Sequence, residues 1–232
     1  MKKLIVCSLL CFSYTLSAQV MSISETNMFR SGNLFLSENN RKYSNMEGTP
    51  YWKDTFEGGE ILFASEQVFE GKIRYDIAAQ VFEFKNDSGQ IYQLEPSEIL
   101  QIAYGGTQFI PAQKLRIESV KNPPTYFQVV VTPAPYGLLA AHRKNVATPR
   151  RDGIAVPGKA LDTQKNKWED EVNYYLVVDK RVMKMPKSAK SFNKISAFNG
   201  IDFKKLLKEN RLSLKKEEDL RELFQILNSR ED

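Results

Sequence analysis

The sequence predicts an α+β protein in which an antiparallel β-meander, folded as a sandwich or a partly open barrel, precedes two or three C-terminal amphipathic helices. Three observations predict this fold class. Short runs rich in aromatic and β-branched residues repeat from Glu60 to about Val131. A last hairpin pattern follows at Val172–Met185. After Pro186 the spacing of apolar residues changes from two to about 3.6, which is typical of helices.

The N-terminus has the pattern of a secretory signal peptide. Two lysines come early, an uncharged run follows at Leu4–Leu16, and the small pair Ser17-Ala18 ends it. The run is shorter than the roughly 20 apolar residues that cross a bilayer as a helix. We therefore expect residues 1–18 to be removed as a signal peptide. The exported chain would begin at Gln19, in the periplasm or outside the cell, with no transmembrane segment left.

Both cysteines, Cys7 and Cys11, lie in this signal segment, so the mature chain would have none. Disulfides persist in the oxidising compartments that exported proteins reach, yet this chain would have no disulfide, zinc–thiolate site or cysteine nucleophile. It also lacks a phosphate-binding Gly-rich loop, a His-Glu-x-x-His pair and a calcium-loop pattern. We predict no cofactor and no metal.

The charge of the chain does not favour nucleic acid as a partner. The formal net charge of +5 falls to +3 when Lys2 and Lys3 leave with the signal, which is too small an excess for a nucleic-acid-binding surface. Two C-terminal helices have the order of a helix-turn-helix, but basic and acidic residues balance over 202–232. We predict no nucleic-acid partner.

Residues 19–45 are rich in Ser, Asn and Glu and lack a regular period, so we interpret them as a mobile lead-in with one short element at about Leu34–Leu36. The antiparallel β-domain is expected over residues 46–185. Before the last hairpin its predicted strands are Ile61–Ala64, Gly71–Tyr75, Val81–Lys85, Ile91–Leu94, Leu100–Tyr104, Leu115–Ser119, Tyr126–Val131 and Tyr136–Ala141.

The clearest hairpin lies at Val81–Leu94, where a run of Asn, Asp, Ser and Gly forms the turn. In its first strand, Phe82 and Phe84 alternate with Glu83 and Lys85. Such alternation is typical of a sheet with one buried face. We therefore expect the aromatic pair in the core and the charged pair in solvent.

Residues 186–232 are expected to form the C-terminal helical segment. Its apolar stripes are Phe203, Leu206 and Leu207, and then Leu220, Leu223, Phe224 and Leu227. Asp202 and Ser213 are the expected N-caps. Glu217 and Arg221 are spaced for an ion pair on an exposed helix face. A shorter helix is expected around Phe192.

Four segments carry a resemblance to a known family. They are Gly48-Thr49-Pro50-Tyr51, Phe69-Glu70-Gly71 with Arg74-Tyr75, Phe82-Glu83-Phe84-Lys85, and Phe203–Asn228. In the order of these segments, most of the mature chain resembles a family of uncharacterised exported proteins of Gram-negative bacteria. The resemblance implies the architecture and the compartment, and it implies no activity and no functional residue.

His142 is the only histidine. A catalytic histidine needs a nucleophile or an orienting acid within reach, and the chain has no Gly-x-Ser-x-Gly motif. The cations Arg143 and Lys144 follow His142 directly. We therefore expect it to be a loop or strand-end residue, and we assign no catalytic residue.

Two groups of carboxylates leave open a glycoside hydrolase, which needs two acids held roughly 5–10 Å apart. The groups are Asp54, Glu57 and Glu60, and then Glu169, Asp170 and Glu171. Trp52 and Trp168 lie near them in the sequence, where an indole could stack on a sugar ring. The alternative is that the acids are solvated and that both indoles belong to the core.

A long connection at residues 142–167 is strongly basic. Its cations are Arg143, Lys144, Arg150, Arg151, Lys159, Lys165 and Lys167, against only Asp152 and Asp162. Long loops are often functional, and these seven residues are the candidate contact with an anionic surface. The alternative is a flexible surface insertion.

The sequence therefore favours a non-catalytic binding or assembly module of the bacterial cell envelope. Its partner would be an anionic envelope component or an envelope protein. The alternative function is a hydrolase that acts on envelope or environmental polysaccharide through paired carboxylates. A cleft with two facing carboxylates beside Trp52 or Trp168 would favour the hydrolase, whereas acids directed outward would favour the binding module.

Overall fold

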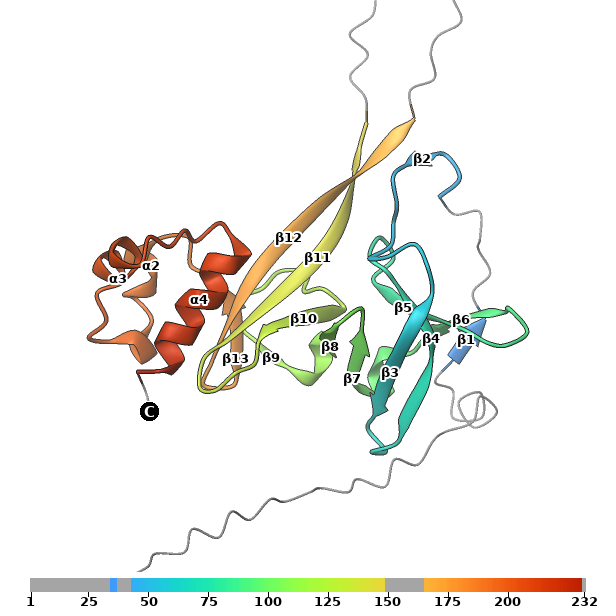
Figure 1. Ribbon diagram of the computed structural model, residues 1–232, viewed down its shortest axis with the longest axis horizontal. Coiled ribbons are helices and arrows are strands. Elements are labelled where there is room, and N and C mark those ends of the chain that lie inside the picture. The colour runs from blue at the N-terminus through green and yellow to red at the C-terminus, as the bar shows by residue number, and fades with distance from the viewer. Residues whose placement is uncertain (1–33, 37–42, 149–164, 231–232) are drawn as a thin grey trace, which may run out of the picture.

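The computed structural model of the chain describes residues 34–36, 43–148 and 165–230 (Figure 1). In this part the strands form one open, mostly antiparallel sheet, and short helices follow it, which confirms the coarse fold class. The predicted signal peptide at 1–18 lies outside the described residues. The strands are β1 Leu34–Leu36, β2 Met46–Glu47, β3 Glu57–Phe63, β4 Val68–Asp76, β5 Val81–Lys85, β6 Ile91–Leu94, β7 Ile99–Tyr104, β8 Thr107–Pro111, β9 Arg116–Ile117, β10 Tyr126–Val131, β11 Gly137–Ala147, β12 Asn166–Val178 and β13 Arg181–Lys184.

The sheet is not a simple meander. Its strand order is β1-β6-β5-β4-β3-β7-β8-β10-β11-β12-β13-β9, with β2 added to β12. After β6 the chain returns to the far side of β3, where β7 pairs with it. The short strands β2 and β9 pair in parallel with β12 and β13. The meander expected from the sequence is therefore interrupted.

The half of the sheet from β3 to β8 curls on itself, and we call it the curled half. Phe82 in β5 and Tyr126 in β10 are far apart in the strand order, yet their ring centroids lie 4.9 Å apart. Gly59 and Gly71 face each other across β3 and β4 at this curve. A Cβ atom at Gly59 would lie 2.4 Å from Cδ1 of Ile73, so the sharp curvature requires glycine there.

The remaining strands, β10–β13, form a layer that is covered on both faces, and we call it the covered half. Leu138 and Ala140 pack under the helices, whereas Leu139 and Ala141 pack against the segment around β9. Successive side chains on a strand point to opposite faces. A strand covered on both faces therefore needs a continuous apolar run, as Leu138–Ala141 provides.

Helices α2 (Ala189–Phe192), α3 (Phe203–Glu209) and α4 (Glu217–Asn228) lie on one face of the covered half. The N-cap expected at Asp202 is confirmed, since its carboxylate accepts a hydrogen bond from the backbone N–H of Lys205 at 3.0 Å. The N-cap expected at Ser213 is wrong. The Asp219 carboxylate accepts from the Ser213 N–H at 2.9 Å, which holds this segment in a loop ahead of α4.

The basic connection is shorter than the sequence indicates. β11 continues to Ala147 and β12 begins at Asn166, so both ends of the loop expected at 142–167 are strand. The two strands stay in register, residue by residue, over this ribbon. His142 is therefore inside a strand, and the expectation of a loop or strand-end residue is wrong.

The structure also contains a strand that the sequence analysis does not place. β8 forms a hairpin with β7 through Gly105 and Gly106, whose φ angles are 62° and 79°. Two-residue hairpin turns require such positive φ angles. The glycine pair, followed by a short alternating run, was the signal for this strand.

Candidate functional site

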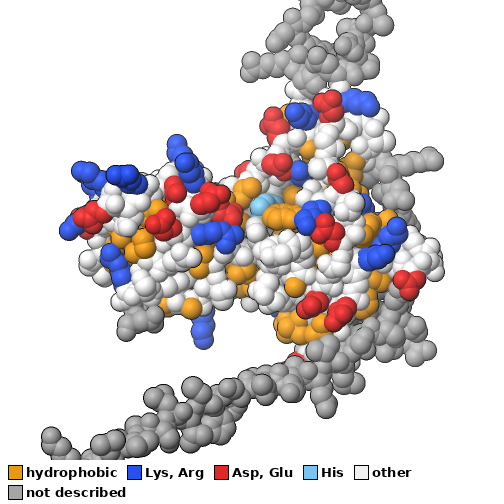
Figure 2. All heavy atoms as spheres, viewed as in Figure 1, with side chains coloured by type: hydrophobic (Ala, Val, Ile, Leu, Met, Phe, Trp, Pro, Cys, Tyr) orange, Lys and Arg blue, Asp and Glu red, His pale blue; other side chains and the backbone are white. Residues whose placement is uncertain are grey.

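One strip of the sheet is covered neither by the curl nor by the helices. Along β10, Tyr126 lies in the core of the curled half and Val130 lies under the helices. Gln128 is on the same face between them, with His142 of β11 beside it. We call the hollow over this strip the notch. Figure 2 shows the histidine in pale blue at the junction of the two halves.

A chain of hydrogen bonds runs along the floor of the notch. Oε1 of Gln128 lies 2.7 Å from Nε2 of His142, and Nε2 of Gln128 donates to Oγ1 of Thr107 at 3.3 Å. Gln128 is only 7% exposed. Polar side chains thus occupy positions whose neighbours on the same strand face are apolar. Departures of this kind from the strand pattern are typical of functional sites.

Burial keeps His142 neutral. Desolvation lowers the pKa of His142 from 6.5 to about 4, although Glu217 and Asp170 oppose the shift. Since the amide oxygen of Gln128 can only accept, the imidazole carries its proton on Nε2. Nδ1 is then an acceptor, and it makes no hydrogen bond within the described ranges. The ring itself is not part of the lining of the hollow, and it acts there through Gln128 and Trp52, which are.

Trp52 forms the wall of the notch on the side of the curled half. Its ring lies edge to face with His142, at a centroid distance of 4.4 Å, and with Phe109 at 5.4 Å. A Cβ atom at Gly105 would lie 3.4 Å from the indole Nε1 and equally close to Cε of Lys53, so a side chain at this position would crowd the donor. Nε1 has no hydrogen-bond acceptor in the described part of the chain.

Helix α4 forms the opposite wall. Arg221 donates to Oε1 of Glu217 from Nε (3.1 Å) and Nη2 (2.8 Å), and from Nη1 to the carbonyl of Val130 (2.7 Å). The hydroxyl of Tyr174 donates to Oε2 of Glu217 at 3.0 Å. The expected ion pair between Glu217 and Arg221 is confirmed. It also ties α4 to β10 at the rim of the notch.

The notch has a volume of about 540 Å³, within the range of small-molecule sites, roughly 300–1,000 Å³. It is lined by Trp52, Gly105–Gln108, Gln128–Val130, Thr132 and Arg221. These residues present amides, a hydroxyl, backbone groups and an indole. The one charged member, Arg221, is paired with Glu217. The lining therefore has the chemistry of uncharged hydrogen bonding.

A larger hollow, of about 900 Å³, borders the same β7–β8 turn. Its charged side chains are Glu60, Glu70, Lys72, Lys85 and Asp87. Glu60 and Glu70 are direct cross-strand partners on β3 and β4. Two acidic side chains therefore stand on neighbouring strands there, although only Glu60 belongs to the acidic groups singled out in the sequence.

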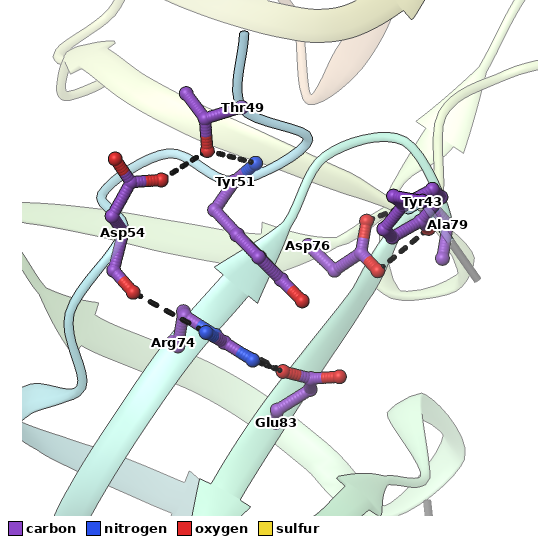
Figure 3. Close-up of polar contacts among 8 residues, drawn as sticks. All are labelled: Tyr43, Thr49, Tyr51, Asp54, Arg74, Asp76, Ala79 and Glu83. Atoms are coloured by element: carbon purple, nitrogen blue, oxygen red, sulfur yellow. Dashed lines mark hydrogen bonds and ion pairs between the residues drawn. The ribbon is translucent and has the colours of Figure 1, made fainter. Parts of the chain in front are cut away.

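A buried ion pair holds the segment that carries Trp52 (Figure 3). Arg74 donates to Oε2 of Glu83 from Nε (3.1 Å) and Nη2 (2.6 Å), and its guanidinium lies over the rings of Tyr51 and Phe56. The two charged side chains are 12% and 7% exposed. The expectation that Glu83 lies in solvent is wrong, because residues 49–57 cover this face of β4 and β5.

The acidic groups expected for a hydrolase are engaged outside the notch. In the first group, Asp54 accepts from the Thr49 hydroxyl and Glu57 pairs with Lys53. The second group lies along β12, where Glu171 accepts from two asparagine amides that hold its pKa below the ordinary value. Neither group supplies a carboxylate to the lining of the notch beside Trp52.

Trp168, the other candidate indole, lies on the β11–β12 ribbon away from the notch lining. Its ring packs edge to face on Tyr43 at a centroid distance of 5.5 Å. Its Nε1 is buried and has no hydrogen-bond partner. Trp168 therefore takes part in packing between the ribbon and the segment that precedes β2.

The seven basic candidate residues are not brought together as one surface. In β11, Arg143 donates to the Asn122 carbonyl at 2.6 Å, and Nζ of Lys144 lies 2.6 Å from Asp170 with the lysine side chain only 6% exposed. Lys165 and Lys167 are exposed at the start of β12. The remaining three, Arg150, Arg151 and Lys159, lie outside the described residues.

Comparison with known proteins adds no family. No family model matches the chain, and neither a curated protein nor a solved structure does. The resemblance to exported proteins therefore stays a prediction. Within residues 43–148 and 165–230, no group of three or more metal-ligating side chains could hold an ion. No helix of the described part is long and apolar enough to cross a membrane.

Proposed function

We propose that this chain is an exported, non-catalytic binding or assembly module of the bacterial cell envelope, and that the notch is its binding site. The observation that carries the proposal is the polar floor of the notch. Gln128 stands between the apolar Tyr126 and Val130 on one face of β10, and His142 follows the apolar Leu138 and Ala140 on β11. Export rests on the signal-peptide pattern of residues 1–18.

A polar floor is unfavourable for folding alone. A buried polar group that lacks a hydrogen-bond partner destabilises a protein by about 1–3 kcal/mol. The buried Gln128 avoids this penalty only because His142 and Thr107 stand beside it as partners. Apolar side chains would fill the strip at lower cost. A ligand that bonds to the remaining donors and acceptors gives these residues a function.

A second contact is proposed at the ends of the basic connection. Lys165 and Lys167 are exposed, and we group them with Arg150, Arg151 and Lys159, which are near in the sequence, as the charges that attract an anionic envelope component. Arg143 and Lys144 are excluded from this group. Both are engaged within the fold.

The alternative, a polysaccharide hydrolase, has one observation in its favour. Glu60 and Glu70 are cross-strand partners, so their side chains stand on the same face of the sheet, and a glycosidase needs two carboxyl groups on one surface. Hydrolysis of envelope polysaccharide by the wild type, and its loss in both Glu60→Gln and Glu70→Gln, would establish the alternative and overturn the non-catalytic role.

Co-purification from native envelope fractions tests the binding proposal. The notch variant is Gln128→Met, which keeps the size of the side chain and removes its hydrogen bonds. The matched control is Gln101→Met on β7, outside the notch lining. We expect wild type and control to retain the same envelope component, and the notch variant to lose it by about tenfold. Equal retention by all three folded proteins would contradict the proposal.

Mass spectrometry of the exported protein tests the compartment separately. The expected N-terminus is Gln19 or a residue close to it, because signal peptidase cuts after small residues such as Ala18. A mature protein that keeps Lys2 and Lys3 would overturn the export argument and leave the notch untouched.

A further inference from the structure

We infer that the notch binds an uncharged saccharide unit of a glycan. This inference rests on the proposed function, since it names the ligand class of the same site. It is carried by the charge balance of the notch, by its mixture of donors and acceptors, by its indole wall and by the pairing of its strands.

The charges around the notch are already balanced. Arg221 is paired with Glu217 through two hydrogen bonds, and the half-buried His142 is neutral because desolvation lowers its pKa. A charged ligand group would lose its hydration without meeting an opposite charge that is not already paired, which is unfavourable. The site therefore favours a neutral ligand.

The polar groups of the notch that can still form hydrogen bonds include both donors and acceptors. Nε1 of Trp52 is a donor, and the Thr107 hydroxyl, which accepts from Gln128, can donate as well. A hydrocarbon ligand would leave all of them unsatisfied. A sugar hydroxyl both donates and accepts, so a ring with several hydroxyls can pair with such a mixture, while its C–H face can pack on an aromatic wall such as Trp52.

A peptide fits this place less well. Extended peptides commonly bind by adding a strand to an open sheet edge. The notch lies over the face of β10, and both edges of β10 are paired, one with β8 and the other with β11. Recognition there has to use side chains that stand on the sheet face, and these are the planar and hydroxyl groups suited to a sugar.

The chain provides its own optical reporter for a test. It has two tryptophans, of which Trp52 lines the notch and Trp168 does not. In the full chain with Trp168→Phe, all indole fluorescence therefore comes from the notch wall. The probes are chitotetraose and maltotetraose as neutral oligosaccharides, a tetramer of galacturonic acid as the charged counterpart, and tetra-alanine as a peptide.

We expect one of the neutral oligosaccharides to shift the Trp52 emission saturably, with little change across a salt series. Adding Gln128→Met should weaken this binding by about tenfold, because the substitution removes the amide that orients His142 and Thr107. Adding Gln101→Met should leave the affinity unchanged. Thermal melts must show that each protein is folded.

Three outcomes would overturn the inference. In the first, the folded Trp168→Phe protein shows no change in emission with either neutral oligosaccharide at millimolar concentration. In the second, its emission responds to tetra-alanine or to the uronic acid tetramer instead. In the third, the affinity is the same with and without Gln128→Met. The outcome of the envelope co-purification is independent of the outcome of the sugar titration. Loss of envelope retention in Gln128→Met without any sugar response would keep the proposed function and reject the ligand class. A sugar response without envelope retention would do the reverse.

Discussion

The curled half and the covered half belong to one sheet, yet they exclude water in different ways. The curled half encloses its own aromatic rings, so Phe82 on β5 packs on Tyr126 of β10 without help from another layer. The covered half stays open and depends on α2–α4 and on the segment around β9. The notch lies where one kind of cover ends before the other begins. A continuous sheet with two kinds of cover thus leaves a polar strip between them, and this strip is the candidate site.

The largest expected effect tests the curled half. Phe82 stacks on Tyr75 at 4.4 Å and contacts Phe109 and Tyr126, so Phe82→Ala should lower the free energy of unfolding by about 3–5 kcal/mol. Denaturant melts followed by near-UV and far-UV circular dichroism should still give one transition, because the two halves share a sheet. Two separate transitions would show that the halves fold independently.

The next effect concerns the face of the curled half that residues 49–57 cover. Glu83→Ala leaves the Arg74 guanidinium buried without its partner, which should cost about 3 kcal/mol. Replacing both residues, as Arg74→Met with Glu83→Leu, should restore most of the stability, since no charge stays buried. Glu70→Ala on the exposed part of β4 is the control. If it lowered the free energy of unfolding as much as Glu83→Ala does, the expected difference between a covered and an exposed glutamate would be contradicted.

The notch itself should make stability depend on pH. The pKa of His142 is about 4 in the folded protein and about 6.5 in an unfolded chain, so the unfolded state takes up the proton first as the pH falls. The contribution is present above pH 6.5 and is lost progressively toward pH 4, by roughly 3 kcal/mol. Melts of wild type and His142→Phe across this range measure it, and identical pH slopes would contradict the buried neutral ring.

The smallest effect on stability is expected at the basic connection. Changing Arg150, Arg151, Lys165 and Lys167 to Ser should alter the free energy of unfolding by no more than about 0.5 kcal/mol. At low salt, anionic envelope fractions should retain this variant less than the wild type. The difference should shrink at physiological ionic strength, where interactions of exposed charges are screened beyond about 8 Å.

A matched control for this variant carries the same loss of charge on the helical segment. Its substitutions are Lys190→Ser, Lys194→Ser, Lys204→Ser and Lys208→Ser, all at exposed positions. Retention that falls equally in both variants would reduce the proposed contact to a general effect of net charge.

Local pattern predicted much of the curled half and little of the notch. The alternation of Phe82 and Phe84 correctly indicated two buried rings. It was wrong about Glu83, because the residues that cover the outer face of β5 come from a segment distant in the sequence. The glycine turn before β8 was a usable local signal. His142 had none, since its cationic neighbours suggest solvent while its partners Trp52 and Gln128 come from other strands or loops.

By itself, the sequence determined the local elements of this protein. Periods of two and of about 3.6 marked the main strands and helices, Asp202 marked a helix start, and the spacing of Glu217 and Arg221 marked their ion pair. Only the tertiary structure decided which strand faces are covered. The residues that bury a strand face are remote in the sequence, so the pattern of the strand indicates that a face is to be buried but does not indicate by which residues. The notch exists because β10 passes from one cover to the other at Gln128, and that position depends on how the whole sheet folds.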